Sequence, residues 1–279
     1  MTAPRTILAA TLTLLLTACG GDPAHPSFAT RVARSVGLAD TPPPPTLGLD
    51  LVCDPSKDST CTTESLDATL VKTLPLIADR PGSVLRLFMV GPDLASTKML
   101  LPIVENNLPT SGNANTAKTA KARFIDASRT ALMAAAQPYL AGNMKGGSPI
   151  AEALTTVAMA AVHTDSRAIC VISDGRQVSA IGGMDFECDD PLPTPQTFAK
   201  TLQKARVLSP GILAGVTVSF TYLTITPIHR KERGCVETLA RLAQIRELWT
   251  AAIEAAGGTA EFNTTTIDPT TITPKKGDS

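Results

Sequence analysis

The stretch Arg167-Ala-Ile-Cys-Val-Ile-Ser-Asp-Gly175 decides the fold class of this chain. Its apolar run, residues 168–172, is typical of a buried strand, and the Ser, Asp and Gly that follow indicate a turn directly after it. Outward from this stretch, the apolar pattern alternates between the period of a strand and that of a helix. Such alternation predicts βαβ crossovers and a mostly parallel sheet.

The individual elements follow from apolar spacing and from turn residues. Strands are predicted at 47–53, 83–90, 98–104, 167–173, 215–225 and 259–263, and helices at 65–80, 120–141, 149–163, 197–208 and 239–256. Pro75 predicts a kink or a break near the end of the first helix. The segments 105–118 and 175–195 predict loops. The fold class is therefore α/β, with a doubly wound, mostly parallel six-stranded sheet and helices on both faces. Ligand sites of such sheets lie at the carboxyl ends of the strands.

Composition excludes several classes of function. The 279 residues carry 25 Lys and Arg against 25 Asp and Glu, so the chain lacks the basic excess of a nucleic-acid-binding protein. With only one Trp, two Tyr and seven Phe, an aromatic platform for base stacking is not expected either. The chain is long enough to bury a substantial core.

The N-terminus predicts export. Arg5 precedes an apolar run at 7–16 that is too short to span a bilayer but suits a signal peptide. The run ends in Leu16-Thr-Ala-Cys19 followed by two glycines, which resembles the lipobox of bacterial lipoproteins. The resemblance implies that residues 1–18 are removed and that Cys19 is lipidated. An ordinary secretory signal with a Cys near its cleavage site is the alternative.

The rest of the chain divides into three predicted parts. Residues 19–46 are rich in Pro and Gly and predict a membrane tether, since four consecutive prolines favour an extended spacer. Residues 47–265 form the predicted domain, and 266–279 predict a disordered tail. A lipid anchor places the protein in the cell envelope. Within the lipobox resemblance, the glycine after Cys19 implies the outer membrane, with the domain facing the periplasm or the cell surface.

Five further cysteines fit an oxidising compartment. Cys53 and Cys61 are candidates for a disulfide across a short loop, and Cys188 and Cys235 for one between two loop regions. Cys170 lies within the buried strand and predicts a free thiol. Spacing alone does not establish this connectivity.

Three polar clusters lie at or near the predicted ligand-binding edge. They occupy residues 54–60 after the first strand, 146–154 at the start of a helix, and 173–175 after the buried strand. Their carboxylates and hydroxyls are hard oxygen ligands, which suit Mg²⁺, Mn²⁺ or Ca²⁺ rather than zinc.

The same clusters resemble those of von Willebrand factor A-type (vWA) domains over residues 47–265. The matching stretches are Asp54-Pro-Ser56, Gly147-Ser-Pro-Ile-Ala-Glu-Ala-Leu154 and Ile172-Ser-Asp-Gly175. The resemblance implies an antiparallel edge strand after the second strand. It also implies a metal-ion-dependent adhesion site, where a divalent cation completes its coordination with an acidic residue of a protein partner.

Position by position, the resemblance assigns metal-ligand roles. Asp54 and Ser56 match the first loop, Ser148 stands where the family usually has Thr, and Asp174 matches the carboxylate of the third loop. Asp58 departs from the pattern, which has a second Ser there. Its carboxylate still offers oxygen, but the added negative charge either tightens Ca²⁺ binding or weakens the attraction for a partner's carboxylate.

Each of these residues also has a plainer interpretation. Asp54 and Asp174 suit turns or caps at strand ends. Ser148 before Pro149 is an ordinary N-cap arrangement. Glu152 in the first turn of a helix suits the helix dipole without any further role.

Catalytic motifs are not found in the sequence. His25, His163 and His229 do not belong to a nucleophile motif, and there is no G-x-S-x-G or phosphate-binding loop. We therefore expect a non-enzymatic, membrane-anchored lipoprotein that mediates protein–protein interaction or adhesion with a divalent cation. The alternatives are a metal-free scaffold of an envelope complex and a periplasmic metal-dependent hydrolase that uses the same acidic edge.

Overall fold

The computed structural model describes most of the predicted domain. The described residues are 45–56, 60–92, 96–109, 113–141, 147–186, 190–221, 229–230, 235–236 and 238–263. The predicted signal peptide, Cys19, the tether up to residue 44, Asp58, Cys188 and the tail 266–279 lie outside them. Contacts divide the chain into two compact units, Met1–Pro43 and Pro44–Ser279, and everything below concerns the second.

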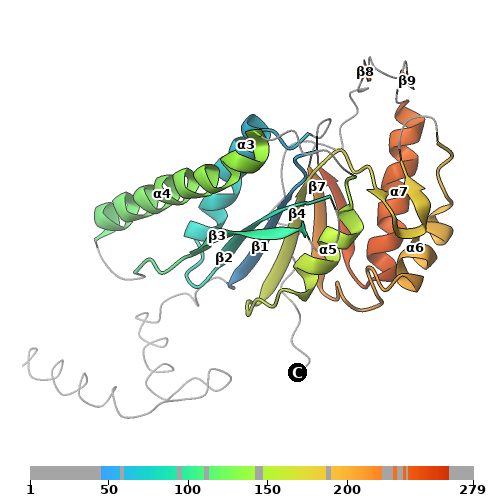
Figure 1. Ribbon diagram of the computed structural model, residues 1–279. Helices are drawn as coiled ribbons and strands as arrows, with labels where there is room; N and C mark the ends of the chain where they lie inside the picture. The colour runs from blue at the N-terminus through green and yellow to red at the C-terminus, as the bar shows by residue number, and fades with distance from the viewer. Residues whose placement is uncertain are drawn as a thin grey trace, which may run out of the picture. The chain divides into compact units, whose positions relative to one another are not determined.

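A six-stranded sheet forms the centre of this unit (Figure 1). Its strands are β1 (Leu47–Cys53), β2 (Val84–Met89), β3 (Lys98–Glu105), β4 (Ser166–Ile172), β7 (Val216–Thr221) and β10 (Thr259–Asn263). The spatial order is β10-β7-β4-β1-β2-β3, and only the edge strand β3 runs antiparallel to its neighbour. The predicted α/β fold class, with one antiparallel edge strand, is confirmed.

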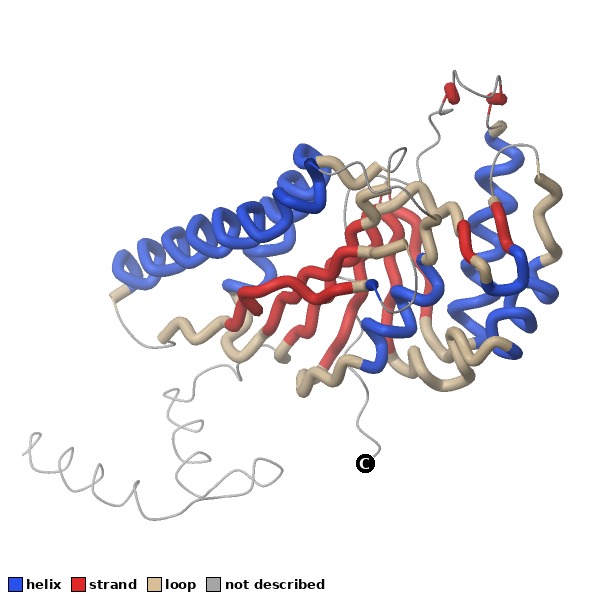
Figure 2. Tube along the Cα trace, viewed as in Figure 1, coloured by secondary structure: helices blue, strands red, loops and turns tan. Residues whose placement is uncertain are grey.

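Helices cover both faces of the sheet (Figures 1 and 2). They are α3 (Thr63–Ala78), α4 (Ala114–Ala141), α5 (Ile150–Met159), α6 (Pro195–Lys204) and α7 (Leu239–Ala255). The buried residues of α3 and α4 share one core cluster, and those of α5, α6 and α7 share the other. Alternation along the strands divides the sheet between the two clusters: Leu49 and Leu51 of β1 pack with α3 and α4, whereas Val52 packs with α5.

Strand order places a topological switch point between β1 and β4. From β1 the chain proceeds to β2 and β3 on one side, and β4, β7 and β10 then fill the other side. The strands are in register at their carboxyl ends, where Cys53 pairs with both Met89 and Ile172. In open α/β sheets, ligands bind outside the carboxyl ends of the strands at such a switch point.

A buried ion cluster ends α5 earlier than predicted. Asp50 of β1 is 1% exposed and accepts hydrogen bonds from the guanidinium groups of Arg86 and Arg167. The same two guanidinium groups donate to backbone carbonyls at residues 157–161. The last carbonyl groups of a helix have no N–H partner within the helix, and here the two guanidinium groups supply the donors. Helix α5 therefore ends at Met159 rather than at His163.

The predicted start of α4 is also wrong, whereas α3 runs without a break through Pro75. Helix α4 begins at Ala114, inside the predicted loop 105–118, because Asn113 accepts a hydrogen bond from the backbone N–H of Asn115 and so starts the helix. Helix α3 continues past Pro75, and the N–H of Asp79 donates to the Pro75 carbonyl at 3.0 Å. The first turn of α4 is polar and exposed, which explains why apolar periodicity missed it.

Short strands interrupt the predicted loop 175–195 and also occur beyond β7. The segment 175–195 contains a small hairpin of β5 (Val178–Ser179) and β6 (Met184–Asp185), joined by the 3₁₀ turn Ile181–Gly183. Beyond β7, the backbone at His229–Arg230 (β8) pairs with that at Cys235–Val236 (β9).

The chain enters the domain at the amino edge of the sheet. The backbone N–H and the hydroxyl of Thr46 donate to the Asp165 carboxylate at 2.7 and 2.9 Å, and the Thr46 carbonyl accepts from the N–H of Ser166. Strand β1 then spans roughly 20 Å to the carboxyl edge. No helix among the described residues is both long and apolar enough to cross a membrane.

Candidate functional site at the carboxyl edge

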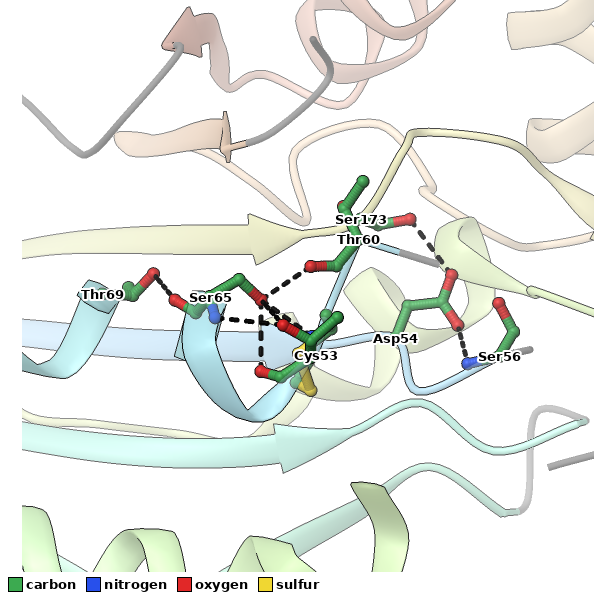
Figure 3. The surroundings of a disulfide bond; sticks show 9 residues. Cys53, Asp54, Ser56, Thr60, Ser65, Thr69 and Ser173 are labelled. Carbon is green, nitrogen blue, oxygen red and sulfur yellow. Dashed lines mark hydrogen bonds between the residues drawn. A yellow bond between two sulfur atoms is a disulfide. The ribbon is translucent and has the colours of Figure 1, made fainter. Parts of the chain in front are cut away.

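Asp54 lies at the centre of the candidate site, directly after β1. Its side chain is buried, with 1% exposed. One carboxylate oxygen accepts from the backbone N–H of Ser56 and the other from the hydroxyl of Ser173, both at 3.1 Å (Figure 3). Ser173 follows β4, so the Asp54 carboxylate joins the first polar cluster (residues 54–60) to the third (residues 173–175) across the switch point.

Ser148, from the second polar cluster (residues 146–154), also reaches the first cluster near Asp54. Its hydroxyl donates to the hydroxyl of Ser56 at 3.0 Å. The N-cap of α5 is Pro149, and no side chain makes a capping hydrogen bond there. The plainer interpretation of Ser148 as an N-cap is therefore wrong, and its hydroxyl points to the first loop instead.

Asp174 is held by a neighbour that the sequence analysis missed. The backbone N–H of Arg176 donates to one Asp174 oxygen at 3.1 Å, and the Arg176 Nε lies 3.6 Å from the other. Both side chains are buried. The carboxylates of Asp54 and Asp174 each accept from the N–H two residues ahead, so the plainer interpretation as turn residues holds for both, alongside any further role.

Glu152 also does more than suit the helix dipole. Its carboxylate is buried and accepts hydrogen bonds from Gln177, at 2.7 Å, and from the hydroxyl of Ser179. The Gln177 side-chain carbonyl accepts in turn from the N–H of Ala151 at 2.9 Å. This network fastens the N-terminal end of α5 to the segment after residues 173–175, where the N–H of Val178 donates to the carbonyl of Ser148 at 3.1 Å.

Trp249 of helix α7 binds the turn at residues 173–175. The indole N–H of Trp249 donates to the carbonyl of Gly175 at 2.6 Å, and its ring packs edge-on against Phe198 of α6. Gly175 has a φ of 75°, a conformation that favours glycine, so the turn after β4 depends on this residue.

Burial dominates the electrostatics of the centre. The pKa of Asp54 is raised, because burial removes the carboxylate from water, although hydrogen bonds from Ser56, Ser173 and Ser148 oppose this effect. A nearby cation would stabilise the ionised carboxylate in this position, because it would replace the hydration that burial removes.

The cysteines behave largely as expected. Cys53 and Cys61 form a disulfide that closes the first loop, and Cys170 is a buried free thiol that contacts the Thr221 hydroxyl. The other predicted pairing remains a prediction, because Cys188 lies outside the described residues and only the backbone of Cys235 is described.

The donor set fits a hard divalent cation in part. Asp54, Ser56 and Ser148 bring carboxylate and hydroxyl oxygens together, which suits Mg²⁺, Mn²⁺ or Ca²⁺. Within the described residues, no group of three or more His, Cys, Asp and Glu side chains is arranged to hold a metal. The fourth predicted ligand, Asp174, faces the guanidinium of Arg176, and the fifth, Asp58, lies outside the described residues.

Comparisons with known proteins establish no family. No family model and no curated protein matches the sequence. Among solved structures, the conserved hypothetical protein BatB from Bacteroides thetaiotaomicron is similar, with 16% identity, a TM-score of 0.36, and coverage of 80% of this chain and 91% of that one. The PilB minor pilin from Streptococcus sanguinis is similar with 10% identity, a TM-score of 0.41, and coverage of 81% and 59%. These similarities concern the fold alone.

Proposed function

We propose that this protein is an envelope lipoprotein whose vWA-like domain binds a protein partner at the carboxyl edge of its sheet. A divalent cation, held by Asp54, Ser56 and Ser148 with Asp174 as a further ligand, assists this binding by attracting an acidic residue of the partner. Cys19 carries the lipid anchor. In this proposal the domain binds its partner and catalyses no reaction.

One observation carries the proposal. Three segments that are distant in sequence meet at the switch point through the Ser148–Ser56 contact of 3.0 Å and the Ser173–Asp54 contact of 3.1 Å. Hydroxyl ligands leave a bound cation with much of its charge unneutralised, and such a cation attracts a carboxylate from outside. The hydroxyl of Ser148 makes no capping hydrogen bond to α5 that would explain its position.

The site is also well placed for a partner. The chain enters at Thr46, on the amino edge, whereas the site lies on the carboxyl edge about 20 Å away. The first described residues of the domain therefore do not occupy the edge that carries the site.

A metal-free scaffold is the second candidate, and Arg176 favours it. The guanidinium beside Asp174 supplies a positive charge from within the chain. A site neutralised in this way would bind its partner through shape and hydrogen bonds, with no response to chelators.

Calorimetric titration of Mg²⁺, Mn²⁺ and Ca²⁺ into the detergent-solubilised full chain tests the cation part. Asp54→Ala removes the central carboxylate, and Asp165→Ala at the opposite edge serves as the matched control. We expect saturable binding that Asp54→Ala abolishes and Asp165→Ala preserves. Absence of binding in the folded wild-type protein would exclude the cation and leave the metal-free scaffold.

A further inference from the structure

Arg176 is a buried cation inside the candidate site. Its side chain is 2% exposed, although it lies in a loop at the edge of the sheet. Its backbone N–H and its guanidinium both approach the carboxylate of Asp174, at 3.1 and 3.6 Å. An arginine is rarely buried to this extent unless a carboxylate compensates its charge.

This pairing changes what Asp174 offers to a metal ion. A carboxylate that already neutralises a guanidinium has less negative potential left for a second cation. A divalent cation bound at Asp174 would also lie close to the positive charge of Arg176, and the buried surroundings would screen their repulsion weakly.

We propose that Arg176 is an internal competitor of the divalent cation for Asp174 and lowers the affinity of the site. This inference rests on the proposed function, because it concerns the same cation. The site then fills only at a high cation concentration, so that partner binding follows the cation content of the surrounding fluid. Removal of the guanidinium frees the Asp174 carboxylate and tightens cation binding.

Arg176→Met tests the proposal in the full chain in detergent, with Mg²⁺ titrated by calorimetry and Ca²⁺ as a second probe. We expect an affinity at least about tenfold higher than in the wild-type protein. Arg129→Met is the matched control, because it removes an arginine from another ion pair, that with Asp67. Arg176→Lys keeps the positive charge and should bind the cation about as weakly as the wild-type protein.

A second substitution shows whether the gain acts through Asp174. In an Asp174→Asn background, Arg176→Met should no longer raise the affinity. Circular dichroism checks folding, and Arg176→Gln replaces Arg176→Met if the latter does not fold. The thermal midpoint should also rise more with Mg²⁺ in Arg176→Met than in the wild-type protein.

The outcomes separate the two proposals. Equal cation binding by the wild-type protein and Arg176→Met, or weaker binding by the variant, would overturn the role of Arg176 while leaving the cation site intact. If neither protein binds a cation, both the competitor role and the cation part of the proposed function are wrong. A tenfold gain that persists in the Asp174→Asn background would also overturn the competitor role.

Discussion

The hydroxyl of Ser148 lies 3.0 Å from the hydroxyl of Ser56, although the two residues are 92 positions apart in the chain. The contact exists because β1 and β4 end in register and because α5 begins at the same edge of the sheet. It joins two loops that have no covalent link, and neither residue caps α5. The hydroxyl of Ser148 therefore bonds within the candidate site and does not cap α5.

Ser148→Ala should cost little stability. The substitution removes one partly buried hydrogen bond, whose net contribution is about 1 kcal/mol or less. Thr62 is the matched control, because it caps α3 in a reciprocal capping box with Ser65. Thr62→Ala should lower the free energy of unfolding by about 1–2 kcal/mol in urea titrations. A larger loss for Ser148→Ala than for Thr62→Ala would show that Ser148 supports the helix after all.

Much of the fold is readable from the sequence. The run Ala168–Ile172 is apolar on every residue, so it predicts a strand that is covered on both faces, and β4 is such a strand in the middle of the sheet. The helix predicted over 65–80, where Leu66, Leu70 and Leu74 recur at helical spacing, likewise corresponds to α3. Periodicity succeeds at these positions because burial of apolar side chains determines where the elements lie.

The missed features are polar ones. Gln177 has no periodic pattern, and its role depends on Glu152, which lies 25 positions earlier and reaches it only after the sheet has formed. The early end of α5 depends in the same way on Arg86, which lies more than 70 positions before the carbonyls that it binds. A local pattern cannot show partners that are brought together by tertiary structure.

Asp50→Leu should be among the most destabilising single substitutions. Asp50 is the carboxylate that Arg86 and Arg167 share beneath α5, and its removal leaves two largely buried guanidinium groups without it. The loss of one partner of a buried ion pair costs about 3–5 kcal/mol. Asp165→Leu, at an exposed hydrogen-bonding position on the amino edge of the sheet, should cost less in urea unfolding. Equal losses in the two variants would contradict the role of the buried cluster.

Cys170 should resist alkylation in the native protein. Burial raises the pKa of its thiol to about 12, so the reactive thiolate is scarce at pH 8. Iodoacetamide followed by peptide mass spectrometry should leave Cys170 unmodified in the folded protein and modify it after denaturation in urea. Rapid native labelling at this position would show that β4 opens readily.

Removal of the Cys53–Cys61 disulfide should loosen the first loop. The bridge closes a loop with a sequence separation of 8, for which chain entropy gives about 2–3 kcal/mol. The double substitution Cys53→Ala/Cys61→Ala should lower the free energy of unfolding by about this amount and weaken cation binding, because Asp54 and Ser56 lie within the loop. An unchanged cation affinity would show that Ser173 and Ser148 position the loop without the disulfide.

The free energy of unfolding should depend on pH differently in the wild-type protein and in Asp54→Asn, because the variant lacks the buried carboxylate. The pKa of Asp54 in the folded state is raised above its ordinary value of 3.8. In the pH interval between these two pKa values, the folded state therefore binds more protons than the unfolded state. Its contribution to stability therefore falls as pH rises through the interval, by at most about 1.4 kcal/mol per pH unit. Urea unfolding in EDTA from pH 3 to 7 should show the wild-type protein losing stability relative to Asp54→Asn. Parallel curves would mean that hydrogen bonds from Ser56 and Ser173 fully offset the burial.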